Sequence, residues 1–195
     1  MSRLRNNSGY SLLEMLIAIS LVSILTLVVV NFFTTISRGY NYLQTESSAA
    51  VDLSNTMDRV AKVIRGATDV VDAQTNSLTI YGYFLPNDAV VDKIKYYVSG
   101  TDLKVSVIPP TGSGPNYTYD PANEKIYTIS RSIPVGAPVV FTYYDDLGNQ
   151  LTGSFATTQI KQVGIQITTN PNPKVLRKSL SSQTTVTLRN KKTNL

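Results

Sequence analysis

Residues 9–36 decide the fold of this chain, and they read GYSLLEMLIAISLVSILTLVVVNFFTTI. Between Leu12 and Phe33 the only charged residue is Glu14, and most of the others are Leu, Ile, Val, Ala, Met or Phe. A helix rises ~1.5 Å per residue, so about 20 such residues suffice to cross the hydrocarbon core of a bilayer. The stretch 10–36 therefore predicts a membrane-spanning helix.

The residues before this helix, MSRLRNNSG, contain two arginines and no acid. Basic residues beside a first apolar segment, here Arg3 and Arg5, remain on the cytoplasmic side of the membrane. We therefore expect a single-pass protein of the cytoplasmic (inner) membrane, with its N-terminus inside and the rest of the chain outside. A cleavable secretory signal fits poorly, because no Ala-x-Ala site follows the apolar stretch and no proline occurs before Pro86.

Glu14 is the unusual residue of the apolar stretch, because a carboxylate inside a spanning helix is costly in lipid and is usually functional. The segment that ends in Gly9, followed by Tyr-Ser-Leu-Leu-Glu-Met-Leu-Ile-Ala, resembles the processing signal of type IV prepilins and pseudopilins. The resemblance implies that prepilin peptidase cuts between Gly9 and Tyr10 and that the new terminus at Tyr10 is methylated. It also implies that Glu14 pairs with the terminal amine of a neighbouring subunit and so sets the register of assembly, since these charges attract strongly in apolar surroundings.

Two positions depart from the family pattern. Tyr10 stands where the family most often has Phe, and Asn31 lies near the place where many major pilins carry a helix-breaking Pro. The missing Pro indicates a straighter helix or a minor subunit. The alternative interpretation is a plain signal anchor that holds an extracytoplasmic ligand-binding domain, in which Glu14 is incidental. An anchor has no need for the combination of Gly9 with Glu14, which favours the assembly subunit.

The apolar pattern continues beyond the membrane segment at helical spacing. The predicted buried stripe comprises Leu43, Ala50, Leu53, Met57, Val60 and Ile64, widened by Ala61 and Val63. The opposite face comprises Glu46, Asp52, Asn55, Asp58, Lys62 and Arg65. We expect residues 37–66 to be the amphipathic half of the same helix, with Gly39 as a soft point at the junction and Gly66 as the C-cap.

From Val70 onward the apolar period changes to two, which is typical of β-strands. The predicted strands are 78–84, 93–98, 103–108, 125–130, 139–144, 150–152, 163–168 and 184–189, with a long loop at 109–123. An antiparallel sheet that packs one apolar face on the helix gives an α+β fold. The predicted organisation is a leader at 1–9, a transmembrane and assembly helix at 10–36, its amphipathic half at 37–66 and a β-rich globular head at 67–195.

Three segments of the predicted head resemble minor pilins of the J-type pseudopilin or W-type pilin group. They read FTYYDDLGNQL at 141–151, IKQVGIQI at 160–167 and TTVTLRN at 184–190. The resemblance implies a minor subunit in a tip complex that primes assembly, and not the bulk subunit of a fibre.

The composition argues against catalysis. The 195 residues include no Cys and no His, which excludes zinc sites of the common kinds, thiol nucleophiles and imidazole bases. No nucleophile, base and orienting group can be assembled into a recognisable motif from what remains. We therefore expect a non-enzymatic protein without a cofactor.

Two groups of polar residues in the head could still bind a ligand. Asp145, Asp146 and Asn149 could hold Ca²⁺, although a polar hairpin turn around Gly148 is the favoured interpretation. The basic residues near the C-terminal end are Lys174, Arg177, Lys178, Arg189, Lys191 and Lys192. They could contact nucleic acid in a salt-sensitive manner, although a solvated surface is favoured, because the formal net charge of the chain is only +5.

The sequence thus predicts a minor pilin or pseudopilin, processed by prepilin peptidase and assembled into a type IV pilus-like filament, or priming one. Secretion, DNA uptake, adhesion and motility are the functions that such filaments serve. The expected partners are other pilin or pseudopilin subunits, prepilin peptidase, a pilus assembly platform and membrane lipid. The expected location is the inner membrane at first, and later a cell-surface or periplasmic filament.

Overall fold

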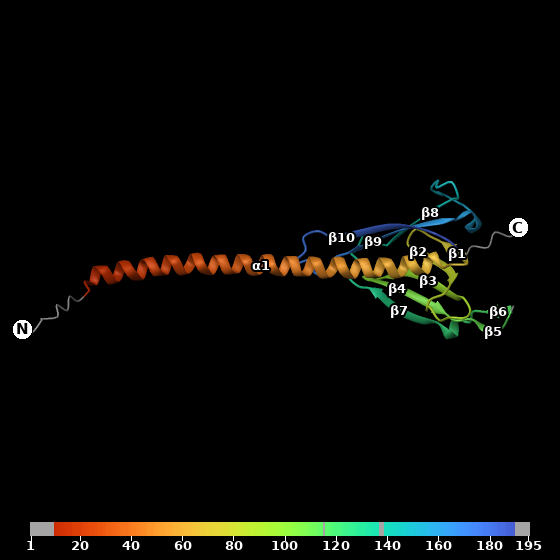
Figure 1. Cartoon of the computed structure of the whole chain (residues 1–195), viewed down its shortest axis with the longest axis horizontal. Coiled ribbons are helices and arrows are strands. Elements are labelled where there is room, and N and C mark those ends of the chain that lie inside the picture. Colours follow the sequence, from red (N-terminus) through yellow and green to blue (C-terminus); the bar gives the residue numbers. More distant parts are fainter. Residues whose placement is uncertain (1–9, 115, 137–138, 190–195) are drawn as a thin grey trace, which may run out of the picture. The chain divides into compact units, whose positions relative to one another are not determined.

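The computed structural model describes residues 10–114, 116–136 and 139–189. The chain divides into two compact units, Met1–Gln44 and Thr45–Leu195. One helix, α1 (Leu12–Arg65), contributes its first part to the first unit and its last part to the second (Figure 1). The predicted leader at 1–9 lies outside the described residues.

The first unit consists of the apolar part of α1. Its large apolar side chains are exposed in the isolated chain, with exposed fractions of 62% for Leu21, 60% for Ile24 and 62% for Phe32. By length and composition, α1 is long and apolar enough to cross a membrane. Helical structure continues through Asn31 and Gly39 without a break, as expected where no proline interrupts the backbone hydrogen bonds.

In the second unit, the last part of α1 buries one face. The buried side chains are those of Ala49, Leu53, Thr56, Met57, Val60, Ala61, Val63 and Ile64. Two predicted stripe positions are wrong, because Ala50 and Leu43 are exposed. Ala49 takes the place of Ala50, since it precedes Leu53 by four residues and so lies on the same face of the helix. The helix ends as predicted, with the Gly66 N–H donating to the carbonyl of Val63 at 3.1 Å.

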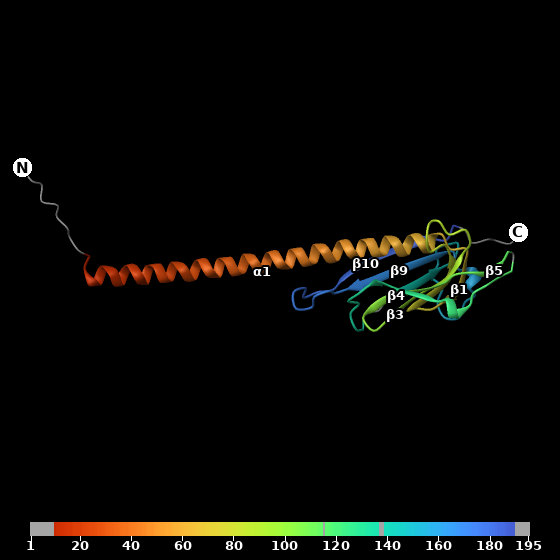
Figure 2. The same cartoon turned by 90° about the horizontal axis from the view of Figure 1, so that it is seen from below.

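The strands of the head form two larger antiparallel sheets and one small hairpin (Figure 2). The five-stranded sheet has the order β1-β2-β3-β4-β7, the three-stranded sheet has the order β10-β9-β8, and β5 pairs with β6. The bounds are β1 (Asp69–Ala73), β2 (Ser77–Gly82), β3 (Asp92–Ser99), β4 (Asp102–Ile108), β5 (Thr111–Ser113), β6 (Asn116–Thr118), β7 (Lys125–Ser130), β8 (Val140–Tyr144), β9 (Gln162–Thr169) and β10 (Leu180–Thr187). Two short 3-10 turns occur at η1 (Pro121–Asn123) and η2 (Thr157–Gln159).

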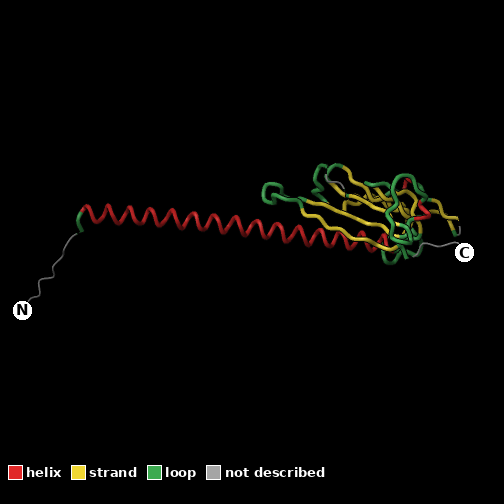
Figure 3. Tube along the Cα trace, turned by 90° about the horizontal axis from the view of Figure 1, so that it is seen from above, coloured by secondary structure: helices red, strands yellow, loops and turns green. Residues whose placement is uncertain are grey.

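The α+β fold class is confirmed, because a long N-terminal helix packs against antiparallel sheets (Figure 3). One core contains the helix face and both larger sheets, with Ile64, Ile80 and Ile165 each almost fully buried. The hairpin between β3 and β4 is also confirmed, since Ser99 pairs with Asp102 and Gly100 has a φ of 63°. Only a residue without a side chain adopts that backbone conformation at little cost.

Four details of the predicted sheet are wrong. The expected single sheet is two, because β8 pairs with β9 and not with β7. The segment 109–123, expected to be a loop, contains the β5-β6 hairpin and η1. Residues 150–152 form only a bridge from Gln150 to Tyr144, and β8 pairs with β9 instead. The last strand begins at Leu180, four residues earlier than predicted, because the polar side chains there alternate between half-buried and exposed without an apolar signal.

Candidate functional site

The N-terminus of α1 is a capping box that involves the predicted register residue. The Ser11 N–H donates to Glu14 Oε2 at 2.9 Å, and the Glu14 N–H donates to Ser11 Oγ at 3.2 Å. The spacing Ser-x-x-Glu satisfies two backbone donors that a helix start otherwise leaves unpaired. A negative side chain in the first turn also complements the positive end of the helix dipole. Glu14 therefore has an intramolecular role, which its sequence spacing from Ser11 could have revealed.

The predicted cleavage site lies immediately before this capping box. Tyr10 is 84% exposed and precedes the helix. Gly9 and the leader arginines, Arg3 and Arg5, lie outside the described residues. Only Tyr10 lies between the predicted cut and Ser11. Cleavage there would place the new amine of Tyr10 next to the first turn of the helix, which carries the Glu14 carboxylate.

The hydroxyl side chains of the apolar segment bond to their own helix. Ser20, Ser23 and Thr26 donate to backbone carbonyls three or four residues earlier, each at 2.8 Å. Thr34 and Thr35 both donate to the Asn31 carbonyl at 2.9 Å. A polar group in hydrocarbon is costly unless it is hydrogen-bonded. The segment thus offers an apolar surface in spite of its Ser and Thr residues.

Comparison with known families agrees with this arrangement. Residues 4–30 match the family model described as the prokaryotic N-terminal methylation motif. The chain thus carries the N-terminal motif of type IV prepilins and pseudopilins. The match covers part of the predicted leader, the capping box and most of the apolar segment, and it does not resolve the subgroup. A search of curated proteins finds no match to the sequence.

The motif indicates how the chain is processed and assembled. Proteins of this family are non-enzymatic structural subunits, and the methylation motif implies processing by prepilin peptidase and assembly with other pilins. The apolar N-terminal helix is consistent with anchoring in the inner membrane before assembly.

In the head, the candidate calcium residues form a hydrogen-bonded turn. Asp145 Oδ1 accepts from the N–H groups of Leu147 at 2.9 Å and Asn149 at 2.8 Å, and Oδ2 accepts from Asn149 Nδ2 at 3.0 Å. The Asn149 side chain, and then these backbone donors, lower the pKa of Asp145 below its usual value. Gly148 has a φ of 83°, as such a turn requires. Among the described residues, no three acidic, His or Cys side chains come together as a metal site, and Asp146 adds no further contact to this turn.

The described members of the predicted basic patch are separated by the length of the three-stranded sheet. Lys174, Arg177 and Lys178 lie in the loop between β9 and β10, next to the end where Leu180 pairs with Thr169. Arg189 follows the opposite end of β10, and its N–H donates to the Arg65 carbonyl. Eight strand residues at ~3.4 Å each put roughly 25 Å between the two ends. Lys191 and Lys192 lie outside the described residues.

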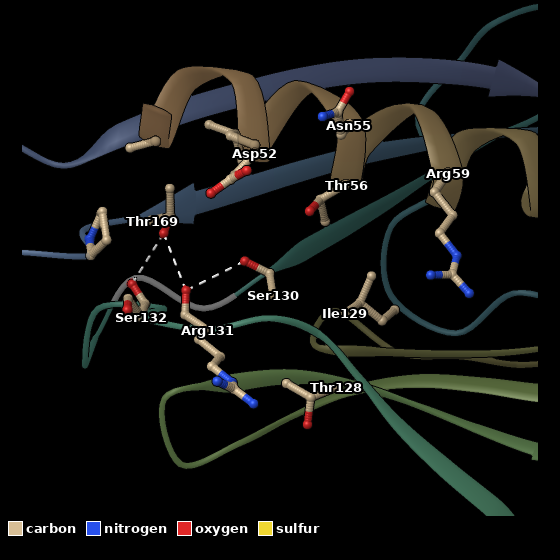
Figure 4. Close-up of a pocket in the computed structure, with 13 residues that line it drawn as sticks. Asp52, Asn55, Thr56, Arg59, Thr128, Ile129, Ser130, Arg131, Ser132 and Thr169 are labelled. Atoms are coloured by element: carbon tan, nitrogen blue, oxygen red, sulfur yellow. Dashed lines mark hydrogen bonds between the residues drawn. The ribbon is translucent and has the colours of Figure 1, made fainter. Parts of the chain in front are cut away.

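A cavity of about 500 Å³ lies between α1 and the crossing from β7 to β8 (Figure 4). Asp52, Asn55 and Arg59 reach it from the helix. On the other side the Thr169 hydroxyl donates to the carbonyls of Arg131 at 3.3 Å and Ser132 at 3.4 Å. Ser132 has a φ of 67°, the one positive value among the described non-glycine residues. These bonds hold the crossing in a conformation that Ser adopts only with strain.

Outside these regions, the head contains a buried acid that the sequence did not reveal. Asp92 at the start of β3 is 6% exposed. Burial, followed by the neighbouring Asp88 carboxylate, raises the pKa of Asp92 to about 6. The Asp88 carboxylate itself accepts from the Leu85 N–H at 2.7 Å, so the two acids secure the connection between β2 and β3.

Proposed function

We propose that this protein is a minor pilin or pseudopilin that is assembled into, or primes, a type IV pilus-like filament. The observation that carries the proposal is the Ser11–Glu14 capping box at the start of an apolar helix, directly after the predicted cut between Gly9 and Tyr10. The proposed organisation is a leader at 1–9, an assembly helix at 10–36, its amphipathic half at 37–66 and a head at 67–195.

The proposed mechanism begins in the membrane. Prepilin peptidase removes residues 1–9, and methylation modifies the new amine at Tyr10. The apolar surface of the helix keeps the subunit in the bilayer until partner subunits replace the lipid around it. Glu14 then accepts the terminal amine of a neighbouring subunit, and the high cost of leaving either charge unpaired in apolar surroundings fixes the register between subunits.

The assignment to a minor subunit rests on the head. The segments at 141–151 and 160–167 resemble J-type pseudopilins and W-type pilins, and in this chain they form the β8 turn and strand β9. The uninterrupted helix through Asn31 fits a minor subunit as well, because many major pilins carry a proline near this position. Such a subunit would sit in the tip complex that starts a filament.

Replacing Glu14 tests the register role. Glu14→Ala is expected to leave membrane insertion and head folding intact and to reduce incorporation into filaments, measured by co-purification with partner subunits. Asp58→Ala, which removes an exposed acid of the same helix, is the matched control. Normal incorporation of Glu14→Ala would contradict the proposal.

A second variant separates the charge of Glu14 from its capping role. Glu14→Gln retains a side-chain acceptor for the Ser11 N–H, since Gln also serves in capping boxes, but it removes the charge. Loss of incorporation in both variants would assign the function to the charge, and loss in Glu14→Ala alone would assign it to the cap. The mass of the mature N-terminus is the accompanying measurement. A terminus at Tyr10 is expected, whereas an intact Met1–Gly9 in cells with active peptidase would favour the plain anchor.

A further inference from the structure

The loop between β9 and β10, residues 170–179, carries three cations and no acid. Lys174, Arg177 and Lys178 are exposed, whereas Leu176 is only 2% exposed and fixes the loop to the head. The Leu176 N–H donates to the Asn172 carbonyl at 2.8 Å, and Asn170 Nδ2 donates to the Leu176 carbonyl at 3.3 Å. The loop is thus a built structure that holds its cations outward.

This loop lies at the end of the head where α1 enters it. Thr169 and Pro171 line the same cavity as Ala49 and Asp52 of α1. The other end of the head is marked by the bond from Arg189 to Arg65. In Figures 1 and 2 the loop before β10 is the part of the head that extends furthest at the entry end.

The length of chain limits how far this end can lie from a membrane. Only eight residues lie between Ile36, the end of the apolar segment, and Thr45, the start of the head, so the two are nine residue steps apart. These steps rise about 14 Å as helix and span at most about 32 Å when fully extended. The connection therefore keeps Thr45 within about 32 Å of the residue at which the apolar segment ends.

We propose that the β9-β10 loop is a membrane-contact site that binds anionic lipid headgroups while the subunit waits in the bilayer. Three exposed cations without an acid in the same loop complement a negatively charged lipid surface. The carboxylates of Glu46 and Asp52 lie on α1 and that of Asp102 lies on β4, outside this loop. The inference rests on the membrane anchoring of α1 and adds a role for the head.

The test uses the full chain in lipid vesicles. Because the sequence has no Cys, a single Ser179→Cys variant accepts one fluorescent donor, and acceptor dyes are placed on lipid headgroups. Energy transfer is expected to be stronger in phosphatidylcholine with phosphatidylglycerol than in phosphatidylcholine alone, and to fall with salt. Changing Lys174, Arg177 and Lys178 together to Gln should lower the ratio of contacting to free heads on the order of 100-fold.

The matched control changes Lys93, Lys95 and Lys104 to Gln, which removes the same charge from β3 and β4. This variant is expected to keep the stronger transfer in anionic vesicles. Equal transfer in the two vesicle types, by a chain that resists alkaline extraction, would overturn the contact alone. Release of the chain by alkali would overturn both the anchoring and the contact.

Discussion

The two parts of α1 use apolar residues in opposite ways. In residues 12–36 apolar side chains lie on all sides of the helix and stay exposed, as at Leu25 with 67%. In residues 45–65 they follow one stripe, and Val60 and Ile64 on that stripe are at most 1% exposed. A helix that is apolar all round requires an apolar surrounding, whereas an amphipathic one requires a single packed face.

The two parts of α1 differ in what covers their apolar surface. The second part is satisfied within the chain, because the sheets of the head cover its apolar face. The first part has no such cover among the described residues, so lipid or other subunits must supply it. One continuous helix therefore combines an intramolecular core element with an intermolecular one.

The largest expected effect comes from the same substitution in the two parts. Ile64→Ala is expected to lower the free energy of unfolding of the head by about 2–5 kcal/mol, because it leaves a cavity in a packed core. Ile24→Ala, at a side chain that is 60% exposed, should leave that free energy unchanged. Denaturant unfolding in detergent, followed by near-ultraviolet circular dichroism of the head tyrosines, measures both. Equal destabilisation by the two variants would contradict the conclusion that only the second part of α1 is packed within the chain.

The second prediction concerns the pH dependence of the stability of the head. The folded head binds the Asp92 proton more tightly than the unfolded chain, since the pKa rises from 3.8 to about 6. This contribution to stability is complete below about pH 4 and is lost as the pH rises through about 6, with a size on the order of 1–3 kcal/mol. Asp92→Asn should flatten this part of the unfolding profile. A wild-type head whose stability changes between pH 4 and pH 6.5 by the same amount as that of the Asp92→Asn head, or rises by more, would contradict the assignment.

The smallest effect is expected at the junction. A Cβ at Gly39 would meet no atom within 4 Å, so Gly39→Ala is expected to stabilise the local helix by up to about 1 kcal/mol. Amide hydrogen exchange of the flanking residues in detergent measures the change, and head unfolding serves as the control. Faster exchange in Gly39→Ala would show that the glycine has a structural role in the monomer.

The sequence predicted correctly those features that depend on the spacing of residues close together in the chain. The apolar run after Glu14, the helical stripe at Leu53, Met57, Val60 and Ile64, and the hairpin at Gly100 each depend on local spacing, and the structure has them as predicted. The N-terminal motif was likewise readable, because Gly9 and Glu14 lie close together in the chain.

Features that depend on distant segments were not predictable in the same way. The division into two sheets depends on residues far apart in the sequence, because Thr169 and Asn170 hold Arg131 and Ser132 by hydrogen bonds after β7 ends. Burial of Asp92 depends on the neighbouring loop with Asp88, and an acid at a strand start reads as exposed. The separation of Arg189 from Lys174 required the strand register, because in the sequence the two stand close together.

The hydrogen bonds of Ser20, Ser23 and Thr26 to their own backbone have a consequence for movement. Because each of these hydroxyls donates to a carbonyl of its own helix, the hydrogen bonds do not depend on what surrounds the helix. Exchange of lipid for protein neighbours then breaks none of them, and neither does the return. The segment can therefore exchange one apolar surrounding for another without losing any of these hydrogen bonds.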